Sequence, residues 1–250
     1  MARGKLAVGF SPCPTAALRP FHKFPDRGLT LIELLIVIAI QAFLVAILLP
    51  SLSAARATAR QSACLATLST WGRGFQYYAQ EFSGFLPRRG QGLQVTTQID
   101  RADDWFNAVP VMLGESSLQQ RFIDGRRPRP GDTGIWNCPA GPADLGFVWL
   151  AYAMSMRVST WNDAYPTKQE RIPKPASLVL LTEGPGPRSS VLPSSAPWNP
   201  DVRHRGSINI LFLDGHVSAF TGSAIGCGAG DPKREDVQWF DPESIWPGPQ

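Results

Sequence analysis

The 250-residue sequence predicts an α+β fold, in which a long N-terminal helix packs on a loop-rich domain with a small antiparallel sheet. Residues 29–84 predict the helix, because an apolar run is followed there by apolar and aromatic residues at helical spacing. Residues 208–220 predict a hairpin, because two apolar runs flank Asp214-Gly215. The 23 glycines and 23 prolines exceed the usual share and predict many loops.

Composition excludes two broad classes of protein. Hydrophobic residues make up 44% of the chain and charged residues 18%, which is too apolar for a wholly disordered protein. The apolar residues are concentrated in one run, so a protein with many membrane spans is also excluded. The length allows one or two domains.

The apolar run covers residues 29–49 and contains one charged residue, Glu33, with Thr30 and Gln41 as its other polar side chains. About 20 apolar residues cross a bilayer as a helix. Most core helices of soluble proteins keep a polar face, which this run lacks. We therefore expect a single transmembrane helix over residues 29–50, with a soluble core helix as the alternative.

Residues 1–28 carry five basic residues and one acidic residue, Asp26. Basic residues beside an apolar run keep that end cytoplasmic. We expect a single-pass protein of the cytoplasmic (inner) membrane, with a cytoplasmic N-terminus and a periplasmic or extracytoplasmic C-terminal domain. A signal peptide cleaved at Ser53-Ala54-Ala55 is the alternative, but the apolar run is longer than the 7–15 residues typical of one.

The distribution of basic and acidic residues along the chain also bears on nucleic-acid binding. A sequence pI near 9.0 favours a nucleic-acid ligand at first sight. Of the 24 basic and 20 acidic residues, five and one lie in residues 1–28, which leaves 19 of each in residues 29–250. That balance offers no net positive charge to a phosphate backbone, so we expect no nucleic-acid partner.

Residues 27–37, which read RGLTLIELLIV, resemble the processing site of type IV prepilins and type II secretion pseudopilins. In that family a prepilin peptidase cuts after the glycine and methylates the new amino terminus. The resemblance implies a cleaved leader at residues 1–28 and a mature chain that begins at Leu29. It places Glu33 and Pro50 at positions 5 and 22 of the mature chain, where the family carries a glutamate and a helix-kinking proline. Leu29 replaces the usual Phe, and the 28-residue leader is long enough to suggest an internal start codon.

The resemblance also implies a role for Glu33. Cleavage leaves a positive amine at Leu29, and the Glu33 carboxylate of a neighbouring subunit can offset the cost of burying that charge. The expected partners are prepilin peptidase, other pseudopilin subunits, the inner-membrane platform of a secretion system, and membrane lipid. The alternative is that Glu33 lies in the headgroup zone without a partner.

Pro50 should kink the helix or mark its exit from the membrane, and residues 51–84 should continue it as an amphipathic helix. Six residues there follow a spacing of three or four: Leu65, Leu68, Trp71, Phe75, Tyr78 and Phe82. Core packing explains such a stripe better than a ligand site does. Gly84 and Pro87 should end the helix.

Residues 85–250 are expected to form the extracytoplasmic domain. Within 88–145 the one predicted element is a short helix opening at residues 103–106. Residues 147–156 fit a buried strand or a short helix, residues 177–182 fit a strand, and the proline-rich residues 184–200 fit a loop.

In the predicted hairpin, Ile208, Ile210 and Phe212 share one face of the sheet. A turn centred on Asp214-Gly215 would pair Val217 with Phe212 and Ala219 with Ile210.

His204, nine intervening residues and Asp214-Gly215 resemble the carboxy-terminal H-X9-DG motif of a large group of prepilin-like proteins. Cys64, Cys138-Pro139 and Tyr152-Ala153-Met154 also resemble features of that group, which usually has Asn where Ser155 stands. We expect His204 to hydrogen-bond the backbone or Asp214 and so to hold the hairpin in place.

The four cysteines are Cys13, in the leader, and Cys64, Cys138 and Cys227. Disulfides persist outside the cytoplasm, and we hypothesise a Cys64–Cys138 bond, with free buried thiols as the alternative. No two cysteines have the spacing of zinc ligands, so no metal site is expected.

Two further sets of residues carry atoms that could bind calcium or take part in catalysis. Asp201, Asp231, Glu235 and Asp236 supply oxygen atoms for calcium, but without an EF-hand pattern, so we expect no cofactor. His204, His216 and Asp214 invite a catalytic interpretation, yet the chain has no nucleophile elbow, and we expect no enzyme activity.

The sequence thus predicts a structural pseudopilin-like subunit that assembles into a pseudopilus or pilus of a type II secretion-like system. The alternative is a membrane-anchored adhesin or carbohydrate-binding module, which clustered exposed tryptophans at 105, 136, 161 and 198 would favour. A hydrolase would require His204, Asp214 and a serine to converge in a cleft.

Overall fold

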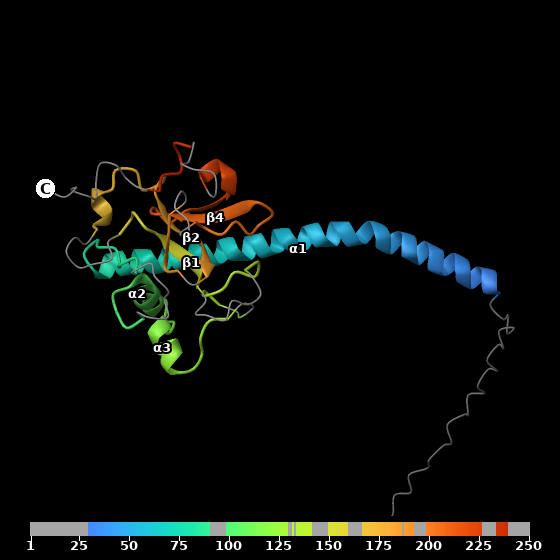
Figure 1. Cartoon of the computed structure of the whole chain (residues 1–250), viewed down its shortest axis with the longest axis horizontal. Helices are drawn as coiled ribbons and strands as arrows, with labels where there is room; N and C mark the ends of the chain where they lie inside the picture. Colours follow the sequence, from blue (N-terminus) through green and yellow to red (C-terminus); the bar gives the residue numbers. More distant parts are fainter. Residues whose placement is uncertain are drawn as a thin grey trace, which may run out of the picture. The chain divides into compact units, whose positions relative to one another are not determined.

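The computed structural model of the chain divides into two compact units, Met1–Leu48 and Leu49–Gln250. It describes residues 30–90, 99–129, 132, 134–141, 150–159, 167–186, 188–192, 199–226 and 234–239. The elements follow the expected order, with one long helix first and a small sheet domain after it (Figure 1). The α+β, pilin-like fold class is therefore confirmed.

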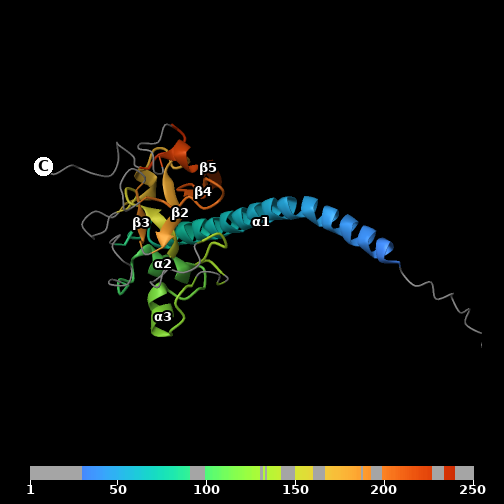
Figure 2. The same cartoon turned by 45° about the vertical axis from the view of Figure 1, so that its right-hand side comes forward.

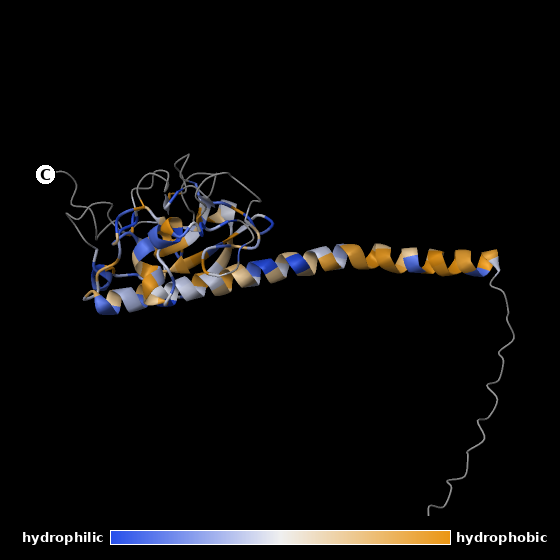
Figure 3. Ribbon diagram, turned by 90° about the horizontal axis from the view of Figure 1, so that it is seen from below, coloured by the Kyte–Doolittle hydropathy of each residue, from blue (hydrophilic) through white to orange (hydrophobic). Residues whose placement is uncertain are grey.

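Helix α1 runs from Leu31 to Glu81 without interruption, and Pro50 lies inside it. The large apolar side chains from Leu31 to Leu49 are between 46% and 81% exposed. Figure 3 shows this apolar stretch at the N-terminal part of α1, followed by more polar turns. By length and composition α1 is the one helix among the described residues that can cross a membrane.

The C-terminal part of α1 packs on the domain through one face. Its buried residues are Cys64, Leu68, Trp71, Gly72, Gly74, Phe75, Tyr78 and Ala79. Most of the predicted stripe is therefore core, although Leu65 is half-buried and Phe82 is 45% exposed. The helix ends where Ser83 and Gly84 adopt positive φ angles.

The sheet has five strands in the order β3-β1-β2-β4-β5 (Figures 1 and 2). They are β1 Leu150–Ser155, β2 Val179–Gly186, β3 Ser190–Val191, β4 Ser207–Phe212 and β5 Val217–Thr221. All neighbouring pairs are antiparallel except β1 and β3, which run parallel. The sheet is thus mixed, whereas the sequence predicted a purely antiparallel one.

Both faces of the sheet are covered by apolar residues. Leu211 and Tyr152 belong to the core cluster that includes Leu68 and Trp71 of α1. On the other face, Ile208, Ile210 and Phe212 pack together as predicted, with Trp239 near the C-terminus. The strands are therefore buried on both sides, which explains their nearly continuous apolar sequences.

The structure corrects two predictions about secondary structure. Residues 184–200 are not all loop, because β2 continues to Gly186 and β3 follows at Ser190. In the stretch 88–145 the predicted helix exists as α2, Trp105–Met112, but a second helix, α3 at Leu118–Ile123, was not predicted. Two short 3-10 helices, η2 at Gln169–Arg171 and η3 at Gly222–Ile225, complete the described elements.

The hairpin at β4 and β5 is present, but its register differs by one residue from the predicted one. Leu211 pairs with Val217 and Ile210 with Ser218. The amide N–H of Gly215 donates to the Phe212 carbonyl at 3.0 Å, and Gly215 has φ +96°. A turn followed by a left-handed glycine makes a three-residue loop in place of a two-residue one, and this shifts the pairing.

Candidate functional site

The predicted processing residues Gly28 and Leu29 lie outside the described residues. Glu33 lies in the first turn of α1 and is exposed. Pro50 lies within α1, and its carbonyl accepts a hydrogen bond from the Ser53 hydroxyl at 2.8 Å. The helix therefore continues past the proline despite the missing N–H donor at this position.

Thr30 and Glu33 form a capping box at the start of α1. The Glu33 carboxylate accepts hydrogen bonds from the Thr30 backbone N–H at 2.8 Å and the Thr30 hydroxyl at 2.7 Å. The Glu33 N–H donates back to the Thr30 hydroxyl oxygen at 3.3 Å. These bonds satisfy helix N–H groups that have no partner within the helix. Glu33 thus has a local partner, which neither sequence interpretation anticipated.

Cys64 and Cys138 are bonded to each other in the structure, with an S–S distance of 2.07 Å. Cys64 belongs to α1, and Cys138 lies in the segment before β1. Both are buried. The bond joins the second half of α1 to residues 74 positions later in the chain, as hypothesised.

Beside this disulfide lies a buried acid–base pair. The Nε2 atom of His204 is 2.5 Å from Oε1 of Glu183, and Cys138 Sγ is 3.6 Å and 3.7 Å from these two atoms. Asn209 donates its side-chain amide to Oε1 of Glu183 at 3.0 Å and its backbone N–H to Oε2 at 3.1 Å. Glu183 is fully buried and His204 is 6% exposed.

Tyr152 and Arg203 lie near the Glu183–His204 pair. The hydroxyl of Tyr152 donates to the carbonyl oxygens of Cys64 and Asn137 at 3.5 Å and 3.4 Å. Burial, and the charge of Glu183, raise the pKa of Tyr152. Arg203 donates hydrogen bonds to two carbonyls, that of Gly184, next to Glu183 in β2, and that of Ala151, next to Tyr152 in β1. The cluster therefore ties β1, β2 and β4 to α1.

The predicted contact between His204 and Asp214 is wrong. Asp214 instead accepts hydrogen bonds from the backbone N–H and the ring Nδ1 of His216, at 3.1 Å and 2.6 Å. His204 does engage the backbone, because its N–H donates to the Ser207 carbonyl at 3.1 Å. The two ends of the H-X9-DG sequence thus make separate contacts, one in the buried cluster and one at the exposed hairpin turn.

Glu183 is the functional candidate that the sequence interpretation missed. It follows the apolar run 177–182, and a carboxylate at the end of such a run is a signal for a buried charge with a partner. With Cys64, Cys138 and His204 it forms a group whose sulfur, nitrogen and oxygen atoms all lie within 4.8 Å of one another. These donors come from four distant segments, so spacing along the sequence could not reveal them.

The acidic residues considered for calcium do not converge among the described residues. The Asp201 carboxylate accepts from Arg203 Nε at 2.7 Å, and Asp236 accepts from Arg234 Nε at 2.8 Å. Glu235 is exposed, and Asp231 lies outside the described residues.

The tryptophans considered for sugar stacking are partly in the core. Trp105 and Trp136 are buried and pack edge-on against Trp71, with ring centroids 5.1 Å and 5.5 Å away. They offer no exposed ring face. Trp161 and Trp198 lie outside the described residues.

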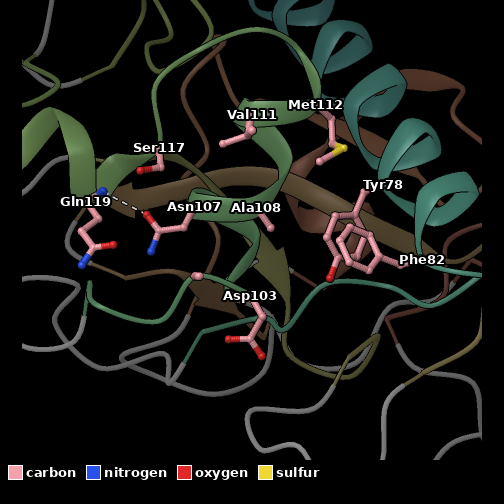
Figure 4. Close-up of a pocket in the computed structure, with 10 residues that line it drawn as sticks. Tyr78, Phe82, Asp103, Asn107, Ala108, Val111, Met112, Ser117 and Gln119 are labelled. Atoms are coloured by element: carbon pink, nitrogen blue, oxygen red, sulfur yellow. Dashed lines mark hydrogen bonds between the residues drawn. The ribbon is translucent and has the colours of Figure 1, made fainter.

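A pocket of about 420 Å³ lies between the end of α1 and helices α2 and α3. Its lining residues are Tyr78, Phe82, Ala102, Asp103, Asn107, Ala108, Val111, Met112, Ser117 and Gln119 (Figure 4). Asn107 donates to the carbonyls of Ile99 and Arg101 and accepts from the Gln119 N–H. The side chain of Asn107 thus joins the loop at residues 99–101 to the start of α3.

Residues 23–49 match the family model of the prokaryotic N-terminal methylation motif. The match covers the predicted cleavage position, Glu33 and the whole apolar run at residues 29–49. No solved structure matches the chain.

Proposed function

We propose that this chain is a pseudopilin-like structural subunit, cut by prepilin peptidase after Gly28 and assembled into a pseudopilus or pilus through its apolar helix. One observation carries the proposal. Residues 31–49, which lie within the segment that matches the N-terminal methylation motif, are also the part of α1 whose apolar side chains are exposed in a single chain. Helices of this kind become buried by lipid before assembly and by neighbouring subunits after it.

Glu33 is the one charged residue between Leu31 and Leu49. Its carboxylate lies at the start of the helix, close to where cleavage after Gly28 creates an amine. In this proposal it first caps its own helix through Thr30 and then pairs with the Leu29 amine of a neighbouring subunit. Such a pair favours one axial offset between neighbouring helices over others.

Site-specific photo-crosslinking tests the assembly. A photoreactive amino acid at Phe43, which is 67% exposed, should give a ladder of crosslinked subunits in cells that contain prepilin peptidase. The same chain in cells without the peptidase is the matched control and should give no ladder, because an uncut leader prevents assembly. Absence of a ladder in the peptidase-containing cells would contradict the proposal.

The second candidate function is a membrane-anchored binding module. The tryptophans at 105 and 136 do not support it, since both are buried. The pocket beside Phe82 is the observation that favours it, because it provides a partly apolar recess with polar groups at its edge. An Ala108→Phe variant would fill the pocket; unchanged crosslinking from Phe43 in that variant would show that assembly does not depend on a ligand there.

We propose no catalytic role for the domain. His204 pairs with Glu183, and Asp214 pairs with His216, so the histidine and aspartate that a triad would require are engaged separately. The proposed activity is assembly, with the chain acting as a substrate of the peptidase.

A further inference from the structure

The two cysteines of the disulfide and the buried pair beside it bring together four side chains that can bind a metal ion. Cys64, Cys138, Glu183 and His204 present two sulfur atoms, one oxygen and one nitrogen. We propose that these residues are a zinc site in the reduced chain, so that the same position holds either a disulfide or a metal ion.

The spacing of the donor atoms supports this proposal. Tetrahedral zinc with bonds of about 2.0–2.3 Å separates its ligand atoms by roughly 3.3–3.8 Å. Cys138 Sγ already lies 3.6 Å from His204 Nε2 and 3.7 Å from Glu183 Oε1. Two adjustments remain: the histidine and glutamate atoms must move apart by about 1 Å from their 2.5 Å contact, and the sulfur atoms must separate once their bond is broken.

The donor types select the metal. Two thiolates, one imidazole and one carboxylate in a tetrahedral arrangement suit zinc better than calcium or magnesium, which prefer oxygen ligands. Three of these donors carry negative charge when bound, and a divalent cation offsets most of that charge in a buried position. When the disulfide is formed, its two sulfur atoms are not available as thiolates, and only Glu183 and His204 remain as metal ligands.

The surroundings hold the ligands in place. Asn209 donates to both carboxylate oxygens of Glu183, through its side-chain amide and its backbone N–H. The main chain of His204 is held by its backbone N–H bond to the Ser207 carbonyl. Outer contacts of this kind orient metal ligands before the ion binds.

Conversion of the disulfide into the zinc-bound form conserves electrons and protons. A dithiol reductant attacks the Cys64–Cys138 bond, and its two electrons convert the disulfide to two thiols while the reductant becomes a cyclic disulfide. Binding of one Zn²⁺ then displaces one proton from each thiol, so two protons are released per metal. Oxidation before metal binding gives the disulfide of the structure.

Cobalt binding tests the site directly. The full chain in detergent, with Cys13→Ser and Cys227→Ser to remove the other thiols, is reduced with a phosphine and titrated with Co²⁺. We expect one equivalent to bind, with thiolate-to-cobalt charge-transfer absorption and the visible bands of tetrahedral cobalt, and one equivalent of Zn²⁺ to abolish both. Near neutral pH about two protons should be released per metal.

The unreduced chain and a chain with Cys64→Ser and Cys138→Ser are the controls, and both should lack the absorption. Glu183→Gln should weaken cobalt binding by at least tenfold. If reduction loosens the domain, addition of zinc should restore its near-ultraviolet circular dichroism. No cobalt uptake by the reduced chain, or equal uptake by the chain without Cys64 and Cys138, would falsify the zinc site.

Discussion

Glu33 combines two physical roles that substitution can separate. Its carboxylate caps helix α1 through Thr30, and its negative charge is available to a neighbouring subunit in the proposed filament. Glutamine can form the same capping box but carries no charge, whereas alanine can do neither. The two substitutions therefore distinguish a local role from an intersubunit one.

We predict that Glu33→Gln abolishes the crosslinked ladder from Phe43 while leaving cleavage by the peptidase intact. Thr30→Ala breaks the capping box but keeps the charge, so it should reduce the ladder only slightly. The comparison is made by immunoblot of crosslinked membranes. Normal assembly of Glu33→Gln, together with failure of Glu33→Ala, would leave the glutamate with a capping role alone.

Asp104 is a buried acidic residue whose environment opposes its charge. It is fully buried, Arg88 Nε lies 3.7 Å from its Oδ1, and neither carboxylate oxygen has a hydrogen bond among the described residues. Burial raises the pKa of Asp104 to about 7, although Arg88 acts in the opposite direction.

The raised pKa has a defined consequence for stability. Between pH 4 and pH 7 the folded chain holds a proton on Asp104 that the unfolded chain has lost, so this residue lowers the free energy of unfolding as pH rises. The effect amounts to on the order of 3–4 kcal/mol across that range. We predict that Asp104→Asn removes most of this slope, as measured by urea unfolding of the detergent-solubilised chain at pH 4–8. Parallel profiles for the variant and the unsubstituted chain would contradict this assignment.

Single residues were the hardest features to predict from the sequence. The predicted processing residues Gly28 and Leu29 lie within six residues of Glu33, so a local pattern can point to all three. Glu183 and His204 meet only because β2 and the segment before β4 lie side by side, and the sequence contains no local pattern for that contact. Of the two contacts expected for His204, the structure has the one to the backbone and, in place of the one to Asp214, a side-chain contact with Glu183.

At the scale of elements, the hairpin turn depends on one glycine. Gly215 has φ +96°, and a Cβ atom there would meet only Gln76 Nε2 at 3.9 Å, so backbone conformation and not crowding restricts this position. The three-residue loop that contains Gly215 sets the register of β4 against β5.

We predict that Gly215→Ala destabilises the domain by about 1–2 kcal/mol, because an L-residue is strained at this φ. Gly215→Asn should cost less, since asparagine tolerates the left-handed region better. The urea midpoints of the two variants and the unsubstituted chain provide the measurement. Equal midpoints for Gly215→Ala and the unsubstituted chain would show that the turn adapts without strain.

Element prediction succeeded where the pattern was long or local. The stripe in α1 extends over several turns, and the Asp-Gly signal requires only its neighbours. Strand β3 has two residues, and its partner β1 runs parallel to it, so neither length nor alternation could identify it. Helix α3 has six residues and lies in a stretch rich in polar residues, which hides its short apolar face.

At the scale of the whole molecule, the two units present different surfaces. The unit Met1–Leu48 exposes apolar side chains on all sides of its helix, and the unit Leu49–Gln250 buries its apolar residues in two clusters. The first surface requires lipid or other helices, and the second is typical of a domain folded in water. This division was predictable from composition, because the apolar run and the even charge balance after it are both properties of the sequence.

Analysis of the mature amino terminus by mass spectrometry tests the central claim most directly. Membranes from cells with prepilin peptidase should yield a chain that begins at Leu29 with a methylated amine, and cells without the peptidase should yield a chain that retains residues 1–28. A chain that keeps Met1 in the presence of the peptidase, or one cut after Ala55, would contradict the account.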